Sequence, residues 1–444
     1  MLALLGRYGW NATSFQILEA GYKYFFSEEE ACVAYVDTGG CWVAAGAPIA
    51  APPALREATE RFIAAARAAG RRACFFATES RFLEASGLPA MCIGEQPAWD
   101  PACWLDTLQK SKSLREQLRR ARAKGVTVRQ VSAPELEDPS SPARLAIERL
   151  ANRWLDSRQM APMSFLVQLS LFTDARERRC LIAERDGQLV GVLGMIPIYA
   201  RGGWFCEDFL RDPAAPNGTV ELLVDAAMRQ AAQSGSRYLT LGLAPLAGQV
   251  PRPLRAARKW GSALFDFEGL RAFKDKLRPQ KWVPIYLSYP ADHSGVSALR
   301  DVLTAFARGS LLGFGLATLL RGPAIVLRLL AALLLPWTGL LALAPLRYFP
   351  APWVKWAWVL FDIGLAAAIL RLTYAWQPLL AGLLMLLLAG DAVLTTMQAL
   401  LYNGPAARGA WDLVLAAVAV AGPSLSAFLL WRGRLHRQSA DSLP

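Results

Sequence analysis

Four long apolar segments in the last third of the sequence limit what this chain can fold into. They lie at about residues 323–346, 353–371, 374–401 and 410–431. Each is long enough to cross the ~30 Å hydrocarbon core of a bilayer, and arginines precede the first segment and follow the last, as cytoplasmic ends do. The sequence therefore predicts an all-α membrane module of four helices at 323–432, followed by a basic cytoplasmic tail at 433–444.

Residues 1–300 contain one order of elements twice. Near Cys32 and again near Cys180, the sequence predicts a strand, a glycine-containing turn and a second strand. A helix follows each hairpin, at 54–69 and at 219–234, ends at a glycine and leads into another strand. This order predicts two α/β lobes of the same kind.

Changes in composition mark the limits of these parts. A stretch rich in Pro and Ser at 134–142 separates the lobes, which we expect at 1–135 and 136–292, the second being catalytic. Residues 293–322 carry arginines among apolar residues, which predicts an interfacial helix that links the lobes to the membrane module.

The composition also restricts the chemistry. The formal net charge of +12 suits an anionic partner, nucleic acid or lipid, although ordinary solubility and positive-inside residues account for it equally well. The seven cysteines form no CxxC pair, which argues against a disulfide framework and a zinc site. The two histidines, His293 and His436, lie outside the expected catalytic region. Acid–base chemistry must then use carboxylates, Lys, Tyr or the substrate, and neither a metal nor a cofactor is expected.

A strongly basic segment, residues 109–129, lies between the lobes and is expected to form a helix that ends at Gly125. Its cations could contact the phosphates of a tRNA acceptor arm or the head groups of anionic lipids. It could equally be a solvated linking helix. The candidate phosphate contacts are Arg115, Arg119, Arg120 and Arg122.

Six segments of the soluble part resemble one known family. They are YGWNATSFQIL (8–18), GEQPAWDP (94–101), SLREQLRRARAKGV (113–126), NGTVELLVDAAM (217–228), LTLGLAPLAG (239–248) and FDFEGLRAFKDKLRPQKWVPIYL (265–287). Together they resemble the synthase domain of the phosphatidylglycerol lysyltransferases, also called multiple peptide resistance factors. The last two segments are the most specific.

The resemblance implies a fold and a reaction. The fold is a tandem of GNAT-type acyltransferase lobes, which agrees with the duplication. The reaction is aminoacyl transfer from aminoacyl-tRNA to phosphatidylglycerol. In this family the membrane part, which flips lipids, precedes the synthase domain, whereas here a smaller module follows it. Lipid synthesis is therefore implied more strongly than lipid flipping.

An acyl-CoA donor is the obvious rival, because GNAT acetyltransferases use one. Such enzymes bind the pyrophosphate with the backbone N–H groups of a glycine-rich loop before a helix. The corresponding loop here, residues 211–218, contains two prolines and lacks the G-x-G pattern. This sequence disfavours CoA as the donor.

Candidate catalytic residues come from two places. Glu207 and Asp208 are expected at the end of a strand, where paired acids could orient a proton or hold the α-ammonium of the donor; a solvated strand end is the simpler alternative. Arg271 and Lys274 lie three residues apart and would share a helix face. Lys274 is expected to contact a phosphate or to stabilise the oxyanion, unless this is only a basic solvated face.

Other residues are candidates for substrate binding. The resemblance implies that Glu221 contacts the aminoacyl group, whereas Asp225 is expected to pair with Arg229. The segment Asn217-Gly218-Thr219 is expected to cap the helix that follows it, near Arg211, and the free N–H groups of this segment could face an anion.

Two N-terminal residues, Tyr8 and Asn11, could line the acceptor channel, although aromatic residues in such a place more often belong to the core.

We expect this chain to be a multi-pass protein of the bacterial inner membrane with its catalytic domain in the cytoplasm. It would transfer an aminoacyl group, lysyl by resemblance, to phosphatidylglycerol. Two alternatives remain open from the sequence. One is a Fem-type transferase acting on a peptidoglycan precursor, and the other is a non-catalytic binding protein with GNAT-like lobes.

Overall fold

The computed structural model divides the chain into two compact units, which we describe separately. The soluble unit contains Met1–Leu155 and Pro162–Phe314, and the helical unit contains Gly315–Pro444. The structure describes the whole chain except residues 28–29, 157–162, 164, 262–265, 308, 316–322, 375–376, 406, 408 and 442–444.

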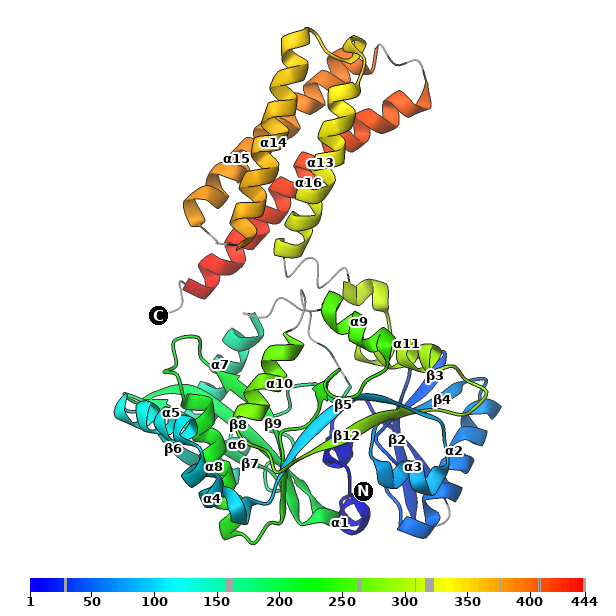
Figure 1. Ribbon diagram of the computed structural model, residues 1–444, viewed down its shortest axis with the longest axis vertical. Helices are drawn as coiled ribbons and strands as arrows, with labels where there is room; N and C mark the ends of the chain where they lie inside the picture. Colours follow the sequence, from blue (N-terminus) through cyan, green and yellow to red (C-terminus); the bar gives the residue numbers. More distant parts are fainter. Residues whose placement is uncertain are drawn as a thin grey trace. The chain divides into compact units, whose positions relative to one another are not determined.

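The soluble unit is built on one sheet, which has twelve strands in the described part of the chain (Figure 1). The strand order is β1-β2-β3-β4-β12-β5-β10-β9-β8-β7-β6, and β11 pairs with β5. The strands are β1 (Lys23–Ser27), β2 (Ala31–Asp37), β3 (Cys41–Ala45), β4 (Arg72–Thr78), β5 (Ala90–Trp99), β6 (Thr127–Val131), β7 (Arg179–Arg185), β8 (Gln188–Ile198), β9 (Gly203–Arg211), β10 (Tyr238–Thr240), β11 (Ala244–Pro245) and β12 (Lys281–Ser288).

Helices connect these strands in chain order. The α-helices are α1 (Leu2–Tyr8), α2 (Leu55–Ala68), α3 (Ser80–Ser86), α4 (Trp104–Lys110), α5 (Lys112–Ala123), α6 (Ala133–Glu137), α7 (Pro142–Asp156), α8 (Thr219–Gln233), α9 (Arg252–Gly261), α10 (Phe267–Lys276) and α11 (Gly295–Phe306). A 3-10 helix, η1, spans Ala12–Leu18.

The predicted duplication is present, and it is more regular than the sequence indicated. Strands β3 and β4 are parallel and are joined by α2, and β9 and β10 are parallel and are joined by α8. The first members of these pairs begin 162 residues apart (41 and 203), and the two helices begin 164 apart (55 and 219). The two halves of the sheet therefore have the same order of strands, in which β2 corresponds to β8 and β3 corresponds to β9.

This match corrects one prediction from the sequence. The hairpin near Cys180 is β7–β8, which corresponds to β1–β2 and not to the hairpin near Cys32, β2–β3. The second half has β9 between its hairpin and its helix. Both predicted hairpins exist, but they are not equivalent. The hairpin near Cys32 corresponds to β8–β9, and the hairpin near Cys180 corresponds to β1–β2.

The last strand of each half lies beside the other half. Strand β12, late in the sequence, is inserted between β4 and β5, and it pairs antiparallel with both. Strand β5 in turn pairs with β10 of the second half, through Leu239–Trp99 and Thr240–Ala98. Neither half of the sheet is complete without a strand from the other.

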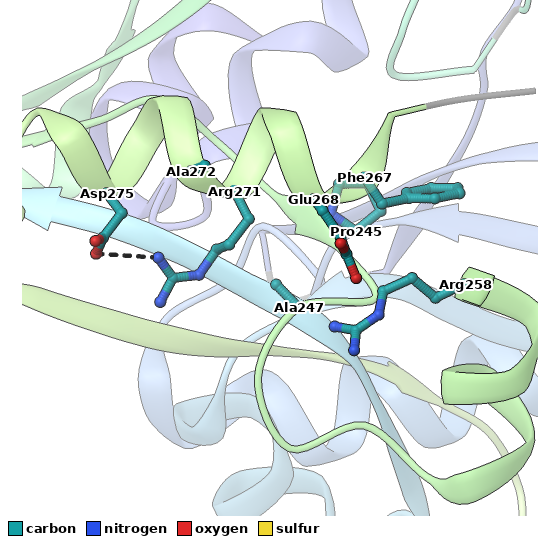
Figure 2. A pocket seen from close by; sticks show the side chains of 8 residues that line it. All are labelled: Pro245, Ala247, Arg258, Phe267, Glu268, Arg271, Ala272 and Asp275. Carbon is teal, nitrogen blue, oxygen red and sulfur yellow. Dashed lines mark hydrogen bonds and ion pairs between the residues drawn. The ribbon is translucent and has the colours of Figure 1, made fainter. Parts of the chain in front are cut away.

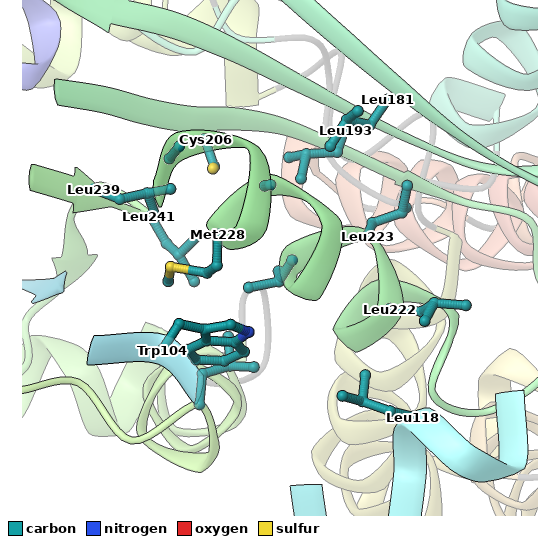
Figure 3. Close-up of a cluster of buried hydrophobic side chains, with 14 of the residues drawn as sticks. Trp104, Leu118, Leu181, Leu193, Cys206, Leu222, Leu223, Met228, Leu239 and Leu241 are labelled. Carbon is teal, nitrogen blue, oxygen red and sulfur yellow. The ribbon is translucent and has the colours of Figure 1, made fainter. Parts of the chain in front are cut away.

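Residues that follow β5 pack with the second half. Trp104, Leu114 and Leu118 lie in one buried cluster with Leu223 and Met228 of α8 (Figure 3), and β6 pairs with β7. The segment from α4 to β6 therefore belongs to the second lobe by its packing.

The basic segment forms two helices where one was expected. Ser111 interrupts it between α4 and α5 in an extended conformation (φ −110°, ψ 95°), and its hydroxyl accepts a hydrogen bond from the N–H of Leu114 at 3.4 Å. A side-chain acceptor at this position starts a new helix. As predicted, the second helix ends near Gly125, which has φ 78°.

A buried carboxylate joins three elements of the second lobe. Asp225 on α8 is 2% exposed. Its Oδ1 accepts hydrogen bonds from Trp104 Nε1 (2.9 Å) and Arg229 Nε (3.0 Å), and its Oδ2 accepts one from Arg122 at 2.7 Å. The expected pair with Arg229 is confirmed, and the carboxylate also ties α4 and α5 to α8.

Replacing Asp225 by Ala should destabilise the second lobe by about 3 kcal/mol, because it leaves the buried indole N–H of Trp104 without an acceptor and removes the charge between two arginines. Faster hydrogen exchange of the α5 and α8 amides would report this loss. Asp106→Ala, an exposed acid on α4, is the control. Equal exchange rates in both variants would show that Asp225 does not stabilise the second lobe.

The helical unit contains the four predicted helices, which are α13 (Pro323–Leu343), α14 (Pro352–Tyr374), α15 (Pro378–Gln398) and α16 (Ala410–Asp441). Among the residues that the structure describes, three segments are long and apolar enough to cross a membrane: Pro352–Leu372, Leu379–Asn403 and Ala410–Phe428. In α13 the apolar stretch found is shorter, Leu330–Leu343.

Asp391 on α15, an acid within one of these apolar segments, is 6% exposed, and Thr395 of the same helix donates a hydrogen bond to it at 2.9 Å.

Candidate active site

Most of the predicted site residues fall into three groups, and the first surrounds α10. This helix begins at Asp266, whose carboxylate accepts a hydrogen bond from the N–H of Gly269 at 2.8 Å. Opposite α10, β10 and β11 both pair with β5, and residues 241–243 between them leave the ladder. Their carbonyl groups are therefore free to turn toward the helix.

Lys274 fills the space in front of these carbonyls. It is 5% exposed, and its Nζ donates to the carbonyl oxygens of Leu241 (2.8 Å), Gly242 (2.8 Å) and Leu243 (2.9 Å). Burial lowers the pKa of Lys274 to about 7. All three N–H bonds of the ammonium group are in use, so Lys274 fixes the path of residues 241–243. Its predicted contact with a phosphate or an oxyanion stays a prediction.

Two neighbours of Lys274 on the same helix also have partners. Arg271 stacks on the ring of Trp282, 3.3 Å from its centre, and donates to Asp275 at 3.2 Å. Lys276 Nζ donates to Oε1 of the buried Glu221 at 2.7 Å, which ties α10 to α8. The structure thus brings Lys274, Arg271 and Glu221 together around one helix.

A pocket of about 230 Å³ opens beside α10 (Figure 2). Two arginines from different helices line it, Arg271 and Arg258 of α9, together with two acids of α10, Glu268 and Asp275. Arg258 donates to the carbonyl oxygen of Leu246 at 3.3 Å. The remaining lining residues are Pro245, Ala247, Phe267 and Ala272.

The second group contains Glu207 and Asp208, which lie inside β9 and not at a strand end as predicted. Strand β9 continues to Arg211, but its register with β8 shifts between the pairs Met195–Cys206 and Leu193–Phe209. Two residues of β9 thus face the single residue Gly194, which is a β-bulge. The absence of a side chain at Gly194 makes room for Asp208, whose Cβ lies 3.3 Å from where a Cβ of residue 194 would be.

A buried arginine joins these acids to the N-terminal segment. Arg178, whose side chain is 3% exposed, is paired with Glu207 and, at 3.3 Å, with Glu19, and it lies over the ring of Phe15. Gln16 Nε2 also donates to Glu207, at 3.0 Å. We call Glu19, Arg178, Glu207 and Asp208 the acid–arginine cluster.

The cluster holds more acids than cations. Burial raises the pKa of Glu19 to about 8 and also raises that of Glu207. Burial, together with the nearby Glu207, raises the pKa of Asp208 well above its ordinary value. Oδ2 of Asp208 is buried and has no hydrogen-bond partner among the described residues. The cluster can therefore accept a further donor, most favourably a cation.

The raised pKa of Glu19 predicts a pH effect on stability. Between about pH 4.5 and pH 8 the folded chain binds more protons at Glu19 than the unfolded chain does. The stabilisation that protonated Glu19 gives the folded state is therefore present at low pH and is lost as the pH rises through this window. Wild-type protein should lose on the order of 2 kcal/mol relative to Glu19→Gln across that range. Thermal unfolding of both proteins at several pH values measures it, and parallel curves would contradict the prediction.

The loop before α8 is closed to a pyrophosphate. Within residues 212–219, the N–H groups of Asp212, Ala214, Ala215 and Thr219 already donate to protein oxygens. Arg211 donates to the carbonyl oxygen of Ala215 (2.7 Å) and to Asn217 Oδ1 (3.3 Å).

Within the predicted capping segment, residues 217–219, the N-cap of α8 is Gly218, which has no side chain to accept a bond. A β-carbon at Gly218 would lie 2.5 Å from the carbonyl oxygen of Gln117 on α5. Helix α5 thus covers the end of α8 where CoA would bind.

The third group is α5, where two of the four predicted arginines are committed elsewhere. Arg115 donates to the carbonyl oxygens of Leu108 and Gln109, and Arg122 pairs with Asp225. Arg119 and Arg120 have exposed side chains, 71% and 65%, and share only the exposed Glu116. They are the arginines of α5 best placed to reach a phosphate.

The N-terminal candidates belong to the first lobe. The side-chain N–H of the buried Asn11 donates to the carbonyl oxygen of Ala77 at 3.1 Å, where the chain has φ 63°. Asn11 lines a small pocket with Trp10, and Tyr8 packs against the core of this lobe. Their role in an acceptor channel stays a prediction.

Three residues around Glu207 were not predicted from the sequence: Arg178, Glu19 and Gln16. Gln16 and Glu19 are polar residues three apart inside the apolar run SFQILEAGY. A polar pair in such a run was the available signal, because buried polar side chains need partners. Nothing near Arg178 in the sequence indicates that it pairs with residues 29 and 159 positions away.

The part of this chain that matches known proteins lies in the soluble unit. The sequence model of the family described as "Phosphatidylglycerol lysyltransferase, C-terminal" matches residues 2–289. The "Lysylphosphatidylglycerol biosynthesis bifunctional protein LysX" of Mycobacterium ulcerans (strain Agy99) is 27% identical over 288 residues, which cover 60% of this chain and 25% of that protein. In Mycobacterium avium (strain 104) the protein of the same name is 26% identical over 283 residues, 60% of this chain and 23% of its own. The chain thus spans about a quarter of the length of these relatives.

Two solved structures share the fold of the soluble unit. A C-terminal domain (DUF2156) from Agrobacterium fabrum has a TM-score of 0.59 at 22% identity, covering 70% of this chain and 96% of that domain. The structure titled "The structure of L-PGS from Bacillus licheniformis" has a TM-score of 0.58 at 21% identity, covering 69% and 95%. The expected fold class, two GNAT-like α/β lobes followed by a helical membrane module, is confirmed.

Proposed function

Because the chain belongs to the phosphatidylglycerol lysyltransferase C-terminal family, we propose that it transfers an aminoacyl group from aminoacyl-tRNA to a hydroxyl of phosphatidylglycerol. The observation that carries this proposal is the match over residues 2–289, which includes both lobes and all three groups of site residues. Lysine is the amino acid that the family description names.

The reaction exchanges one ester for another. The lipid hydroxyl oxygen forms a bond to the aminoacyl carbonyl carbon, and the bond from that carbon to the ribose oxygen of the tRNA breaks. The hydroxyl proton ends on the ribose oxygen. Because the donor ester is already activated, alignment of the two substrates can supply several kcal/mol, roughly 7–11 in favourable cases.

The acid–arginine cluster is suited to the cationic part of the donor. An aminoacyl group carries an α-ammonium, and a lysyl group carries a second one. Asp208 Oδ2 is a buried acceptor without a partner among the described residues, beside Glu207. We assign the binding of an ammonium group to Asp208 and Glu207, with Arg178 holding Glu207 in place.

The α10 group is suited to the acceptor. Lys274 holds residues 241–243, and the adjoining pocket presents Arg258 and Arg271. Guanidinium groups bind phosphodiesters well because they present paired N–H donors. We assign the phosphate of the lipid head group to this pocket, with Glu221 supporting α10 through Lys276.

The closed loop before α8 supports aminoacyl-tRNA over acyl-CoA as donor. Four of its N–H groups, those of Asp212, Ala214, Ala215 and Thr219, are bonded within the protein, and α5 covers the helix end. A pyrophosphate would therefore find few of the donors that CoA-binding proteins give it. The chain is a membrane protein. We place it in the inner membrane, with several spans and with the soluble unit in the cytoplasm, where charged tRNA is found.

Mass spectrometry of lipids from a host that lacks aminoacylated lipids tests the function. Expression of the full chain should produce aminoacylated phosphatidylglycerol, and the purified protein should consume charged tRNA. Expression of Asp208→Asn is the matched control and should give little product. A purified protein that consumes acetyl-CoA and ignores every charged tRNA would refute the proposal.

Arg119 and Arg120 should contribute to tRNA binding. Replacing both by Ala should raise the KM for charged tRNA several-fold with little change in kcat, and should reduce the slope of affinity against salt by about 2, one for each lost phosphate contact. Arg56→Ala combined with Arg185→Ala, two exposed arginines on α2 and β7, removes the same net charge and is the control. A double variant with an unchanged salt slope would exclude α5 from the tRNA interface.

A further inference from the structure

Helix α11 of the soluble unit has two different faces. The inner face, Ala298, Asp301, Val302 and Ala305, is buried. Both oxygens of Asp301 accept hydrogen bonds from Arg72 on β4, at 2.9 Å and 2.6 Å. This bidentate pair and the buried side chains fix the orientation of α11 on the sheet, so its outer face is fixed too.

The outer face of α11 is apolar with one cation. Val296 and Leu303 are 79% and 48% exposed, and Arg300 between them is exposed. The spacing of four and three residues places all three on one side of the helix. The helical turn that follows, residues 311–315, exposes Leu312 to 89%. A soluble protein rarely leaves such large apolar side chains in a row facing water.

Helix α9 extends this surface with positive charge. Its Leu254 is buried in the same core cluster as Ala298 and Val302 of α11. Arg252 and Arg255 of α9 are exposed. Asp301 is the one acidic residue in the sequences of α9 and α11, and it is buried against Arg72. The exposed charge of the two helices is therefore positive.

We propose that this surface lies on the bilayer and binds anionic lipid head groups. We call it the α9–α11 face and define it by Arg252, Arg255, Val296, Arg300, Leu303 and Leu312. Apolar side chains flanked by arginines are the composition of elements that lie in a membrane interface, and each arginine near an anionic surface adds about 1 kcal/mol. The chain itself continues from Leu312 into α13, the first helix of the helical unit, which keeps this end of the soluble unit close to the membrane.

This inference deepens the proposed function but does not depend on catalysis. Arg258, which lines the pocket beside α10, comes from the same helix as Arg252 and Arg255. A face that lies on the bilayer would bring this pocket to the lipids. The last part of the expected linker, residues 316–322, lies outside the described residues.

Photocrosslinking in the full chain tests the proposal without any transfer assay. The photoreactive residue p-benzoylphenylalanine replaces Leu303 or Leu312, and the protein is reconstituted into vesicles of phosphatidylglycerol and phosphatidylcholine. Phe26 on β1, which is 62% exposed, and Leu145 on α7, which is 39% exposed, are the control positions. Lipid adducts at 303 and 312 should exceed those at the controls by about tenfold, because only the former lie in the interface.

Charge reversal separates the arginines from the apolar residues. Changing Arg252, Arg255 and Arg300 to Glu should lower the adducts at position 303 at least about fivefold in vesicles with phosphatidylglycerol, and much less in phosphatidylcholine alone. Arg56, Arg185 and Arg237, which are exposed elsewhere on the soluble unit, give the matched triple control. Adducts equal to those at Phe26, or adducts to a second copy of the protein or to the helical unit in place of lipid, would overturn the proposal.

Discussion

Replacing Lys274 by Ala is expected to lower aminoacyl transfer by about a hundred- to a thousandfold, the loss seen when a group that organises a reaction centre is removed. The variant leaves three carbonyl groups, those of residues 241–243, without their buried donor. Each unsatisfied buried carbonyl costs about 1–3 kcal/mol. The segment should therefore move, and the pocket beside α10 should lose its shape.

Two measurements distinguish this effect from general unfolding. Transfer is measured under initial-rate conditions, and hydrogen exchange is measured at the amides of residues 241–247 and, for comparison, of the first lobe. The first lobe should be unchanged. Lys281→Ala, an exposed lysine on β12, should behave as wild type. Near-normal transfer in Lys274→Ala would remove this residue from the mechanism.

Changing Asp208 to Asn or Glu207 to Gln should lower transfer by about a hundredfold or more, in the range found for residues that handle charge or protons in a reaction. Both changes keep the shape of the side chain and remove the negative charge that the carboxylate would carry beside a bound ammonium group. In the acid–arginine cluster that charge is what would hold an ammonium group. The expected loss is in kcat/KM for charged tRNA, with the lipid dependence unchanged.

Asp225→Asn is the control for the loss of a buried carboxylate outside the acid–arginine cluster. Asp225 is also a buried acid, but its oxygens already accept three hydrogen bonds within the protein. Its replacement should lower stability more than transfer. If Asp225→Asn impaired transfer more than Asp208→Asn did, the assignment of the ammonium site would be wrong.

The fold was predictable where local patterns carry it. Glycines after α2 and α8 and the apolar spacing within them identified two equivalent helices, and from these the two lobes followed. The exchange of β5 and β12 was not predictable, because strand pairing between residues 94 and 285 leaves no signal in either segment. The same limit explains the misplaced hairpin, since strands of similar composition look alike until their neighbours are known.

The candidate site shows the same division. Asp208 was identified because two adjacent acids in an apolar strand are unusual, but the bulge that buries both was invisible. Lys274 was identified by its motif. Its partners are backbone carbonyls, and the sequence carries no record of which carbonyls leave a β-ladder. Arg178 has neither a local pattern nor a motif, and it became recognisable only through contacts with distant residues.

The exchanged strands also impose an order on synthesis. Strand β4 ends at Thr78, but its neighbour β12 leaves the ribosome only with Ser288. One edge of β4 therefore stays unpaired until more than two hundred further residues have been translated. The first apolar helix begins soon afterwards, at Pro323, so closure of the sheet and delivery of the nascent chain to the insertion machinery fall within one short interval. A slow closure would expose the open edge of β4 at the moment when the ribosome docks at the membrane.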